Sequence, residues 1–320
     1  MATIETARGP IDAADLGRTL MHEHVFVLTP DSERQWGDDW DEEERVADAV
    51  TRLNALAAAG ISTIADPTVD GLGRDIARIE RIQREVALNI IVATGVYTYH
   101  EVPNFFRYRG PDLMPSLPDP MVDFFVRDIR EGVKGTGVRA AFLKCAIDHF
   151  GMAPGVERVL RAVAKAHLET GAPIMVHTHP TTRTGLEVQR VLVEEGVEPP
   201  GVLLAHSGDT PDVDHLSALA EAGFLLGMDR FGIDTTLGFD ERVGTVAEMC
   251  RRGFAGSMVL SQDASCYIDW IDPMAMGLAN QRWHYLHVLE DVVPALVERE
   301  VSEEQIDQML VGNPRRYFGG

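Results

Sequence analysis

Thr19-Leu20-Met21-His22-Glu23-His24-Val25-Phe26-Val27 is an apolar stretch that carries a His-Glu-His triplet at its centre. Its near-continuous hydrophobicity is typical of a strand that is buried on both faces, as in a parallel sheet. Because side chains alternate along a strand, His22 and His24 are expected to point to the same face. Two neutral imidazoles on one face are half of a metal site, but two half-buried structural histidines would give the same pattern.

Similar apolar stretches recur along the chain and define the predicted fold. Seven follow the first, at residues 62–67, 89–97, 140–148, 173–179, 202–208, 224–230 and 258–264. Segments with apolar residues at helical spacing separate them, at residues 42–59, 75–86, 122–133, 156–170, 185–195, 213–222 and 242–252. Eight buried strands alternating with helices predict an α/β fold, a (β/α)8 TIM barrel in a single domain over residues 1–320. A doubly wound open sheet is the alternative, which the similar lengths of the eight strands disfavour.

Several segments fall outside this alternation. Residues 97–120 contain five prolines and several aromatic residues, which indicate a packed loop at a pocket mouth or an oligomer contact. Residues 266–282 follow the last strand and are expected to form either a packed surface loop or an apolar wall for a substrate. Two closing helices are predicted at residues 283–297 and 302–310, the first of them interrupted at Pro294 and the second opened by a capping box.

The composition argues against several classes of partner. Among the 320 residues 45% are hydrophobic, and the formal net charge is −21. A chain this acidic lacks the basic surface that nucleic acids require, and anionic membranes would repel it. The sequence contains no signal-peptide pattern and no apolar run of membrane-spanning length. Its three cysteines make no disulfide framework, so we expect a protein of the reducing cytoplasm.

Polar side chains end most of the predicted strands. In chain order they are Asp66, Tyr97, Lys144, His177, His206, Arg230 and Asp263. In a TIM barrel, the C-terminal ends of the strands form the catalytic face. With the His-Glu-His triplet, this face would hold four histidines, an aspartate and a lysine. Imidazole and carboxylate ligands suit zinc, iron, cobalt or manganese, and one catalytic ion needs about three protein ligands. The set therefore predicts a binuclear metal site.

Lys144 is the unusual member of this set. An ammonium group at the end of a buried strand, beside metal ions, would be strongly unfavourable. The lysine is therefore expected to pair with an acid, to be neutral or to be modified. Reaction with carbon dioxide would convert it to an anionic carbamate, which can bridge two metal ions about 4 Å apart.

The order of these motifs resembles the phosphotriesterase family of the amidohydrolase superfamily, and within it the phosphotriesterase-like lactonases. The resemblance runs from Arg8-Gly9-Pro10 to Gly312-Asn313-Pro314 and covers essentially the whole chain. It rests on the ordered set of an H-x-H pair, a strand-end lysine, two strand-end histidines and a strand-end aspartate. Each piece alone is a weak motif, whereas the ordered set is specific.

This resemblance implies a role for each strand-end residue. The ligands of a more buried divalent ion would be His22, His24 and Asp263. The ligands of a more exposed ion would be His177 and His206. Lys144, N6-carboxylated, would bridge the two ions, which are Zn, or Fe, Co or Mn.

Three further residues favour the lactonase branch of the resemblance. Tyr97 ends the third strand, Arg230 follows the seventh, and Trp270 lies in the last loop. Tyr97 would otherwise be a packing residue at the barrel rim, and Arg230 an ion-pair partner that can still line the pocket. Gln262 precedes the metal aspartate where many lactonase relatives have histidine. His179 matches no family ligand and is expected to lie in a loop or behind the ligands.

The resemblance implies hydrolysis of lactones, with N-acyl-homoserine lactones as the expected substrates, as in quorum quenching, and weak organophosphate triester hydrolysis. In that reaction the proposed catalytic residues are Asp263, Tyr97 and Arg230. The alternatives are a dedicated phosphotriesterase (an aryldialkylphosphatase), another amidohydrolase acting on a cyclic amide or a different ester, and a non-catalytic metal-binding barrel. The expected partners are a small-molecule lactone and a second copy of the chain in a homodimer.

Overall fold

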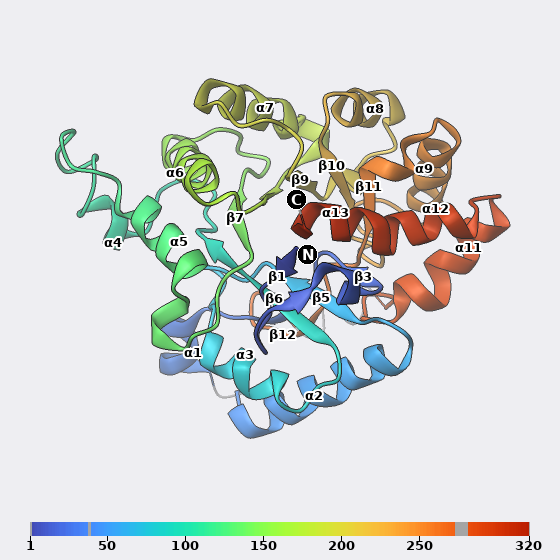
Figure 1. Ribbon diagram of the computed structural model, residues 1–320, viewed down its shortest axis with the longest axis horizontal. Coiled ribbons are helices and arrows are strands. Elements are labelled where there is room, and N and C mark those ends of the chain that lie inside the picture. The colour runs from blue at the N-terminus through green and yellow to red at the C-terminus, as the bar shows by residue number, and fades with distance from the viewer. Residues whose placement is uncertain (1, 38–39, 273–280, 320) are drawn as a thin grey trace.

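Eight parallel strands form a barrel at the centre of the molecule (Figure 1). The computed structural model describes residues 2–37, 40–272 and 281–319. In chain order the strands are β3 (Thr19–Leu20), β5 (Thr63–Asp66), β6 (Asn89–Gly95), β7 (Phe142–Ala146), β8 (Ile174–His177), β9 (Val202–Ala205), β10 (Leu225–Met228) and β11 (Met258–Leu260). Each strand pairs in parallel with the next in the chain. All eight lie within the predicted apolar stretches, so the (β/α)8 barrel is confirmed.

The first predicted strand is not continuous. It divides into β3 and β4 (His24–Val27), and β4 pairs in parallel with β12 (Ser265–Ile268). His22 lies in the break, so the expectation of both histidines on one regular strand was wrong. Two backbone bonds at this break join the first and last strands, from Asp263 N to His22 O at 3.0 Å and from His24 N to Ala264 O at 2.8 Å. The barrel therefore closes through residues of the His-Glu-His triplet.

A buried carboxylate explains why the first strand breaks. Glu23 is fully buried, and its oxygens accept hydrogen bonds from Ser261 Oγ and from the backbone N–H groups of Gln262 and Ala264. The two backbone N–H groups would otherwise have to be satisfied by a regular ladder between the first and last strands. Glu23 thus replaces part of the ladder.

Helices form an outer ring around the strands (Figure 1). They are α1 (Pro30–Trp36), α2 (Glu42–Ala58), α3 (Ile76–Gln83), α4 (Asn104–Arg107), α5 (Pro120–Arg130), α6 (Pro154–Thr170), α7 (Thr184–Glu195), α8 (Val213–Glu221), α9 (Phe239–Arg251), α11 (Val293–Glu298), α12 (Glu303–Asp307) and α13 (Asn313–Gly319). The seven predicted inter-strand helices are confirmed to within a few residues, whereas α1, α4 and α13 were not predicted. None of the helices in the described ranges has the length and hydropathy of a membrane span.

Alternation along each strand separates two hydrophobic cores. In β7, Leu143 and Cys145 point outward into the core beneath the helices, whereas Phe142 packs in the core inside the barrel. Lys144 lies two residues beyond Phe142, so its side chain also points inward. The strand period therefore directs a lysine into the barrel, and its position near the end of the strand brings it to the C-terminal face.

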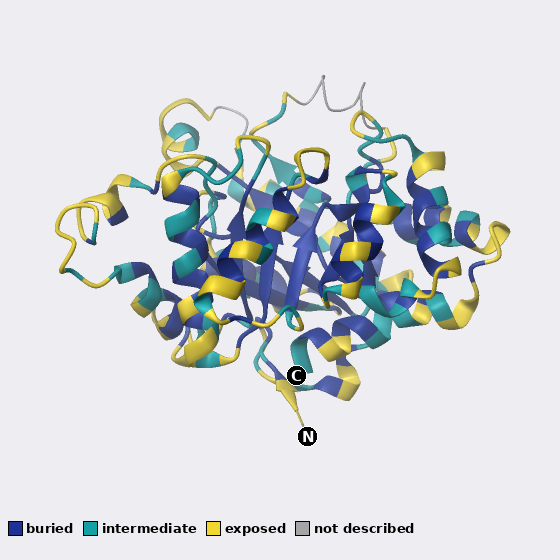
Figure 2. Cartoon of the chain, turned by 90° about the horizontal axis from the view of Figure 1, so that it is seen from above, coloured by how far each residue is buried: buried dark blue, intermediate teal, exposed yellow. Residues whose placement is uncertain are grey.

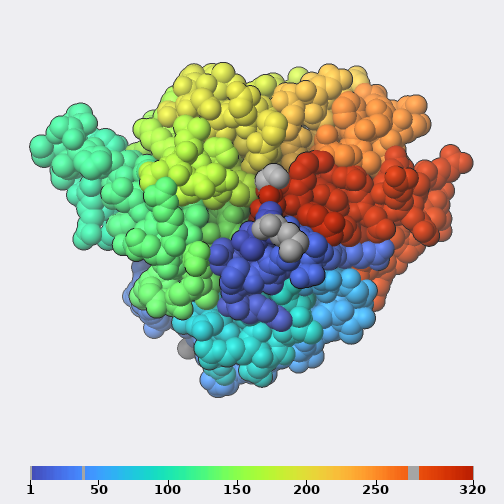
Figure 3. Space-filling view, in the orientation of Figure 1, coloured from blue at the N-terminus to red at the C-terminus, as the bar shows by residue number. Residues whose placement is uncertain are grey.

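The two ends of the chain close the opposite face of the barrel. The short strands β1 (Thr3–Ile4) and β2 (Ile11–Asp12) pair with each other, and α13 packs against β1. Phe318 in α13 contacts Phe142 at the start of β7, with ring centroids 5.8 Å apart. Figure 2 marks the N and C ends close together on this side, and in Figure 3 the blue N-terminal segment lies against the red C-terminal segment.

The closing helices confirm the expected interruption at Pro294. A π-helical turn, Val288–Val292, precedes α11, in which Pro294 occupies the first turn. The Val293 N–H bonds to Val288 O across this junction, and Pro294, which has no N–H to donate, follows directly. Ser302 and Gln305 form the predicted capping box of α12.

Candidate metal centre

The six predicted ligands meet at the C-terminal face of the barrel. All six line one cavity of about 270 Å³. The six residues are His22, His24, Lys144, His177, His206 and Asp263. The predicted pocket residues Tyr97, Arg230 and Trp270 line the same cavity. His22 and Asp263 thus come together although 241 positions separate them in the chain (263 − 22). The roles of the six residues as metal ligands stay predictions.

Three donor atoms converge on one point between the first and last strands. The Nε2 atoms of His22 and His24 each lie 3.3 Å from Asp263 Oδ1. Ligands of a tetrahedral ion with bonds of about 2.1 Å are separated by about 3.4 Å, which is close to the spacing here. This group therefore has the chemistry and the spacing of a three-ligand site for a divalent ion.

A second pair of histidines lies beside this group. His206 Nε2 lies 2.9 Å from His177 Nδ1 and 3.9 Å from Asp263 Oδ2. Lys144 Nζ lies 3.5 Å from His22 Nε2. Asp263 thus faces both the His22/His24 group and the His177/His206 group. Lys144 lies beside the His22/His24 group.

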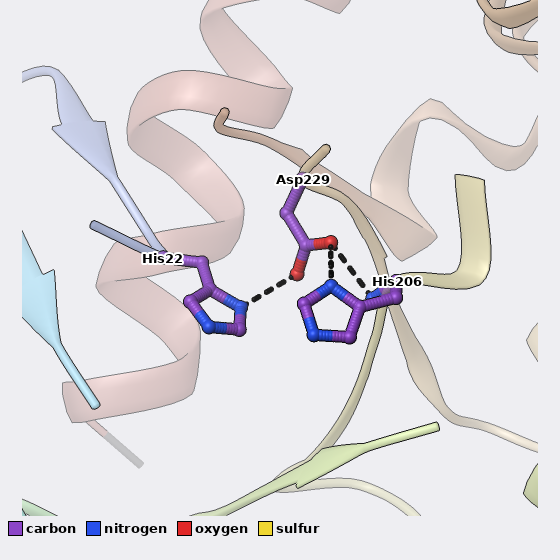
Figure 4. Close-up of side chains that lie close together, drawn as sticks. All are labelled: His22, His206 and Asp229. Carbon is purple, nitrogen blue, oxygen red and sulfur yellow. Dashed lines mark hydrogen bonds and ion pairs between the residues drawn. The ribbon is translucent and has the colours of Figure 1, made fainter. Parts of the chain in front are cut away.

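Asp229 orients one histidine from each group (Figure 4). Its Oδ2 lies 2.9 Å from His22 Nδ1, and its Oδ1 lies 3.0 Å from His206 Nδ1. Oδ1 also accepts a bond from the His206 backbone N–H at 2.7 Å. Because each Nδ1 is engaged by the carboxylate, each Nε2 is left for the cavity. Sequence reasoning missed Asp229, whose only indication was its place after a strand and before Arg230.

Oxygen acceptors also orient the other two histidines. His24 Nδ1 lies 2.7 Å from Thr68 Oγ1, which in turn donates to Asp66. His177 Nε2 lies 2.5 Å from Asp148 Oδ2, so its Nδ1 faces the cavity. All four rings therefore have one nitrogen held by protein and the other directed at the site, as in histidines that bind metals. Thr68 and Asp148 were not predicted.

Burial sets the protonation of these groups. It lowers the pKa of His22 and His206 well below the usual value, and that of His177 to about 4 although Asp148 opposes the shift. The imidazoles of His22, His177 and His206 are therefore neutral near pH 7, which is the state that coordinates metals. Burial also lowers the pKa of Lys144 to about 8, against the opposing effect of Asp263 and Asp229.

Two of the strand-end residues have left-handed backbone conformations. His206 follows β9 with φ of 65°, and Asp263 follows β11 with φ of 54°. Non-glycine residues are uncommon in this region, at a cost of about 1–3 kcal/mol each, and such residues cluster at functional sites. The two residues predicted to serve different ions are thus both held in strained positions.

Tyr97 lies directly over the second histidine group. Its hydroxyl is 3.2 Å from His177 Nδ1 and 2.7 Å from the hydroxyl of Tyr99. Burial and the neighbouring Tyr99 raise the pKa of Tyr97 well above its usual range. The side chain is therefore a phenol, able to donate a hydrogen bond into the cavity.

Arg230 combines the two roles considered for it. It lines the cavity, and its Nε donates to Asp263 Oδ2 at 3.1 Å while one terminal nitrogen lies 3.1 Å from Asp209. Burial lowers its pKa, but Asp209 and Asp263 outweigh that effect and keep it well above its usual value. Arg230 is therefore a fixed positive charge beside the predicted ligands.

Tryptophans border the cavity on the side of the last loop. The Trp270 ring lies 5.9 Å from that of Tyr97 and is 45% exposed. Trp283, which was not predicted, donates from Nε1 to the carbonyls of Gln262 and Asp263 at 2.8 and 3.1 Å. Within the last loop, residues 273–280 lie outside the described residues.

Neither Gln262 nor His179 is among the residues that line the cavity. The Gln262 side chain points away from the cavity, donating to Tyr285 O and accepting from Val288 N. It therefore anchors the segment before α11 and does not contact the predicted ions. His179 lies in the loop after β8, where Nδ1 lies 2.9 Å from Thr182 Oγ1, and it is not among the residues that line the cavity.

Comparisons with known proteins agree with this architecture. The sequence profile described as "Phosphotriesterase family" matches residues 2–318. A "Phosphotriesterase homology protein" of Mycobacterium tuberculosis is 53% identical, over 99% of this chain and 98% of the relative. An "Aryldialkylphosphatase" of Saccharolobus solfataricus is 37% identical over 96% of each chain. The solved structure of a phosphotriesterase from Mycobacterium tuberculosis superposes with a TM-score of 0.97, at 53% identity, over 99% of this chain and 98% of that one. The chain therefore belongs to the phosphotriesterase family and is a hydrolase of that family.

Proposed function

We propose that the protein is a binuclear metal-dependent lactonase that opens N-acyl-homoserine lactones and hydrolyses organophosphate triesters weakly. The observation that carries the proposal is the position of the Tyr97 phenol, 3.2 Å from a predicted ligand atom and bonded to Tyr99. A neutral donor fixed beside the metal ligands suits the developing oxyanion of a carboxylic ester.

The donor set supports two divalent ions, Zn, or Fe, Co or Mn. His22, His24 and Asp263 supply two imidazole nitrogens and a carboxylate for one ion, and His177 and His206 supply two imidazole nitrogens for the second. Such ions, when bound, lower the pKa of a water molecule and polarise a carbonyl oxygen. These four histidines and Asp263 would hold the two ions.

Lys144 is proposed to bridge the two ions as an N6-carboxylated side chain. Its depressed pKa of about 8 leaves a fraction of neutral amine near pH 7. That amine can attack carbon dioxide, forming an N–C bond and releasing a proton. The resulting anion would lie beside the cationic centre, which removes the difficulty of a buried ammonium group.

The chain's own residues have distinct tasks in lactone opening. Tyr97 donates a hydrogen bond to the carbonyl oxygen as negative charge develops there. Asp263 accepts the proton of the attacking water and transfers it to the leaving alkoxide of the ring. Arg230 holds Asp263 through the 3.1 Å contact and thereby keeps the carboxylate in position.

The lining of the cavity supports a substrate with a hydrocarbon tail. Apolar side chains line the cavity around the predicted metal ligands. These side chains belong to Val27, Leu72, Ile233, Ile268, Trp270, Ile271 and Trp283. A small polar ring at the metal centre and an aliphatic chain along these residues would satisfy both parts of the cavity. Trp270 is proposed as the rim residue over which the tail passes.

A second candidate function is that of a dedicated phosphotriesterase. It is favoured by the likeness to the protein named "Aryldialkylphosphatase", and the same ions and water would serve a tetrahedral phosphorus centre. Steady-state kinetics with a long-chain N-acyl-homoserine lactone and with paraoxon separate the two. The lactonase proposal requires the higher kcat/KM for the lactone, and the reverse order would establish the phosphotriesterase.

The cytoplasm is the proposed compartment. Cys145, Cys250 and Cys266 are all buried free thiols. Their burial raises the pKa of each thiol, so they are protonated and structural.

A further inference from the structure

A second group of metal-binding side chains lies outside the catalytic cavity. His284, His287 and Asp291 precede α11: His284 lies in the turn before the π-helical segment Val288–Val292, and Asp291 lies within that segment. One possible ligand atom from each residue lies within 4.8 Å of the other two. None of the three residues lines the catalytic cavity, so this cluster is separate from the binuclear centre.

The buried member of the cluster has one oriented and one unpaired ring nitrogen. His287 is fully buried, and its Nδ1 lies 2.7 Å from Asp291 Oδ2. Its Nε2 is also buried and has no hydrogen-bond partner in the part of the chain that the structure describes. Burial lowers the pKa of this imidazole, although Asp291 opposes the shift. Nε2 lies on the ring edge opposite Nδ1, so an ion shared with Asp291 would bind Nδ1, and the unpaired Nε2 takes no part in such a site.

The surroundings of the cluster favour a cation. A surface cleft next to Asp291 is lined by the acids Asp234, Asp240, Glu241, Glu290 and Glu298. One of them, Asp234, has a buried Oδ1 that lacks a partner within the described ranges. Arg282 also lines the cleft, where its guanidinium stacks over Phe239 at 5.0 Å. Asp240 is paired with Arg299, and the remaining acids leave negative charge predominant in the cleft beside Asp291.

We propose that His284, His287 and Asp291 form a third metal site, for a divalent transition metal such as Zn²⁺, outside the catalytic centre. Two imidazoles and a carboxylate are a ligand set that Zn²⁺ accepts, with water completing the coordination. A hard cation such as Mg²⁺ would prefer an all-oxygen set. The site takes one ion per chain.

The position of this site connects it to the catalytic centre. Trp283 directly precedes His284 and holds the backbone carbonyls of Gln262 and Asp263. Gln262 in turn bonds to Tyr285 and Val288, on either side of His287. An ion bound by residues 284–291 would therefore fix the segment that holds Asp263 in its left-handed conformation.

The test is a calorimetric titration of the enzyme, already loaded with two metal equivalents, with Zn²⁺. The wild type is expected to show one further site per chain. His284→Ala, at an exposed position that should not affect folding, is expected to weaken that site at least about tenfold. Glu290→Gln is the matched control, because it removes a negative charge from the same cleft but not a ligand, and it should retain the site. The unfolding temperature of the loaded wild type should rise with added Zn²⁺ and that of His284→Ala should not.

Three outcomes would overturn the proposal. The loaded wild type binds no further Zn²⁺, or His284→Ala binds it as tightly as the wild type does. Equal weakening by His284→Ala and Glu290→Gln would show that the acidic cleft attracts cations without a defined site. Each outcome leaves the lactonase proposal untouched, because that depends on the two metals in the central cavity.

Discussion

Lys144 is the residue whose chemistry depends most on its neighbours. It is fully buried, points into the barrel and lies 3.5 Å from His22 Nε2. We expect Lys144→Ala to lose at least one metal ion and most lactonase activity, and a short carboxylate such as propionate to restore part of both. Lys165→Ala, at an exposed position on α6, is the matched control and should behave as the wild type. Full activity of Lys144→Ala without added carboxylate would contradict a bridging role.

The same lysine should give a characteristic pH dependence. Carboxylation requires the neutral amine, whose fraction rises as the pH passes the lowered pKa of about 8. At fixed dissolved carbon dioxide, recovery of activity by the metal-free enzyme should be faster at pH 8.5 than at pH 6.5, by about 25-fold from the neutral fraction alone. The measurement is the initial rate of reactivation after metal is added. A rate independent of pH would show that the amine of Lys144 does not limit recovery.

Tyr97 offers a test of transition-state stabilisation. Removing its hydroxyl deletes one donor over the metal centre, and loss of such a donor typically lowers kcat by about 100-fold. Tyr97→Phe should therefore lower kcat for a lactone by about that factor while metal content stays unchanged. Tyr99→Phe removes the group that bonds to Tyr97 and should have a much smaller effect. Equal losses in the two variants would indicate that the pair acts only in packing.

The sequence predicted the six proposed ligands and three of the pocket residues that line the cavity, but neither Trp283 nor the carboxylates behind the histidines. His177 and Asp263 could be found because each ends an apolar strand. Asp148 and Asp229 also lie at the ends of predicted strands, but their partners lie far away in the chain and a single carboxylate at a strand end has many possible uses. Glu23 was visible in the first motif, yet its role as the joint between first and last strands depends on barrel closure.

At the level of elements, the close contact between β6 and β7 depends on a glycine. Gly95 has φ of 151°, and a Cβ there would lie 1.8 Å from the carbonyl oxygen of Lys144. Gly95→Ala should therefore displace β7, lower the free energy of unfolding by at least about 2 kcal/mol and weaken metal binding. The measurements are a denaturant titration and the metal-to-protein ratio.

Gly244 provides the control for that substitution. It lies inside α9 with open space around the Cβ position, so Gly244→Ala should stabilise the protein by about 0.5–1 kcal/mol. A Gly95→Ala protein as stable and as metal-rich as the wild type would contradict the close-packing argument.

Hydrophobic periodicity predicted most of the elements but not the break in the first strand. Seven helices and eight strands followed from hydrophobic periodicity, because a barrel strand is buried on both faces and a surrounding helix on one. The break between β3 and β4 did not follow, since an apolar sequence continues across it. The buried Glu23 carboxylate, not hydrophobicity, decides the pairing there.

For the whole molecule, a homodimer stays a prediction. The segment around α4 projects from the barrel (Figure 1) and exposes four large apolar side chains, Phe105, Tyr108, Leu113 and Met114. Such a concentration on one projection is typical of a contact surface. Sedimentation analysis should find a dimer for the wild type and a monomer for the double variant Tyr108→Glu, Leu113→Glu. Leu168→Glu, which alters an exposed leucine on α6, should remain dimeric. A monomeric wild type would contradict the prediction.

The most direct test of the metal centre is a titration of the metal-free enzyme with Zn²⁺ in the presence of bicarbonate, followed by hydrolysis of an N-acyl-homoserine lactone. The His284→Ala variant is the protein to use, so that an ion at the outer cluster does not enter the count. Activity should be absent without metal and should rise until two equivalents per chain have been added. Lactone hydrolysis by the metal-free protein, or saturation at one equivalent, would contradict a pair of ions held by six convergent side chains.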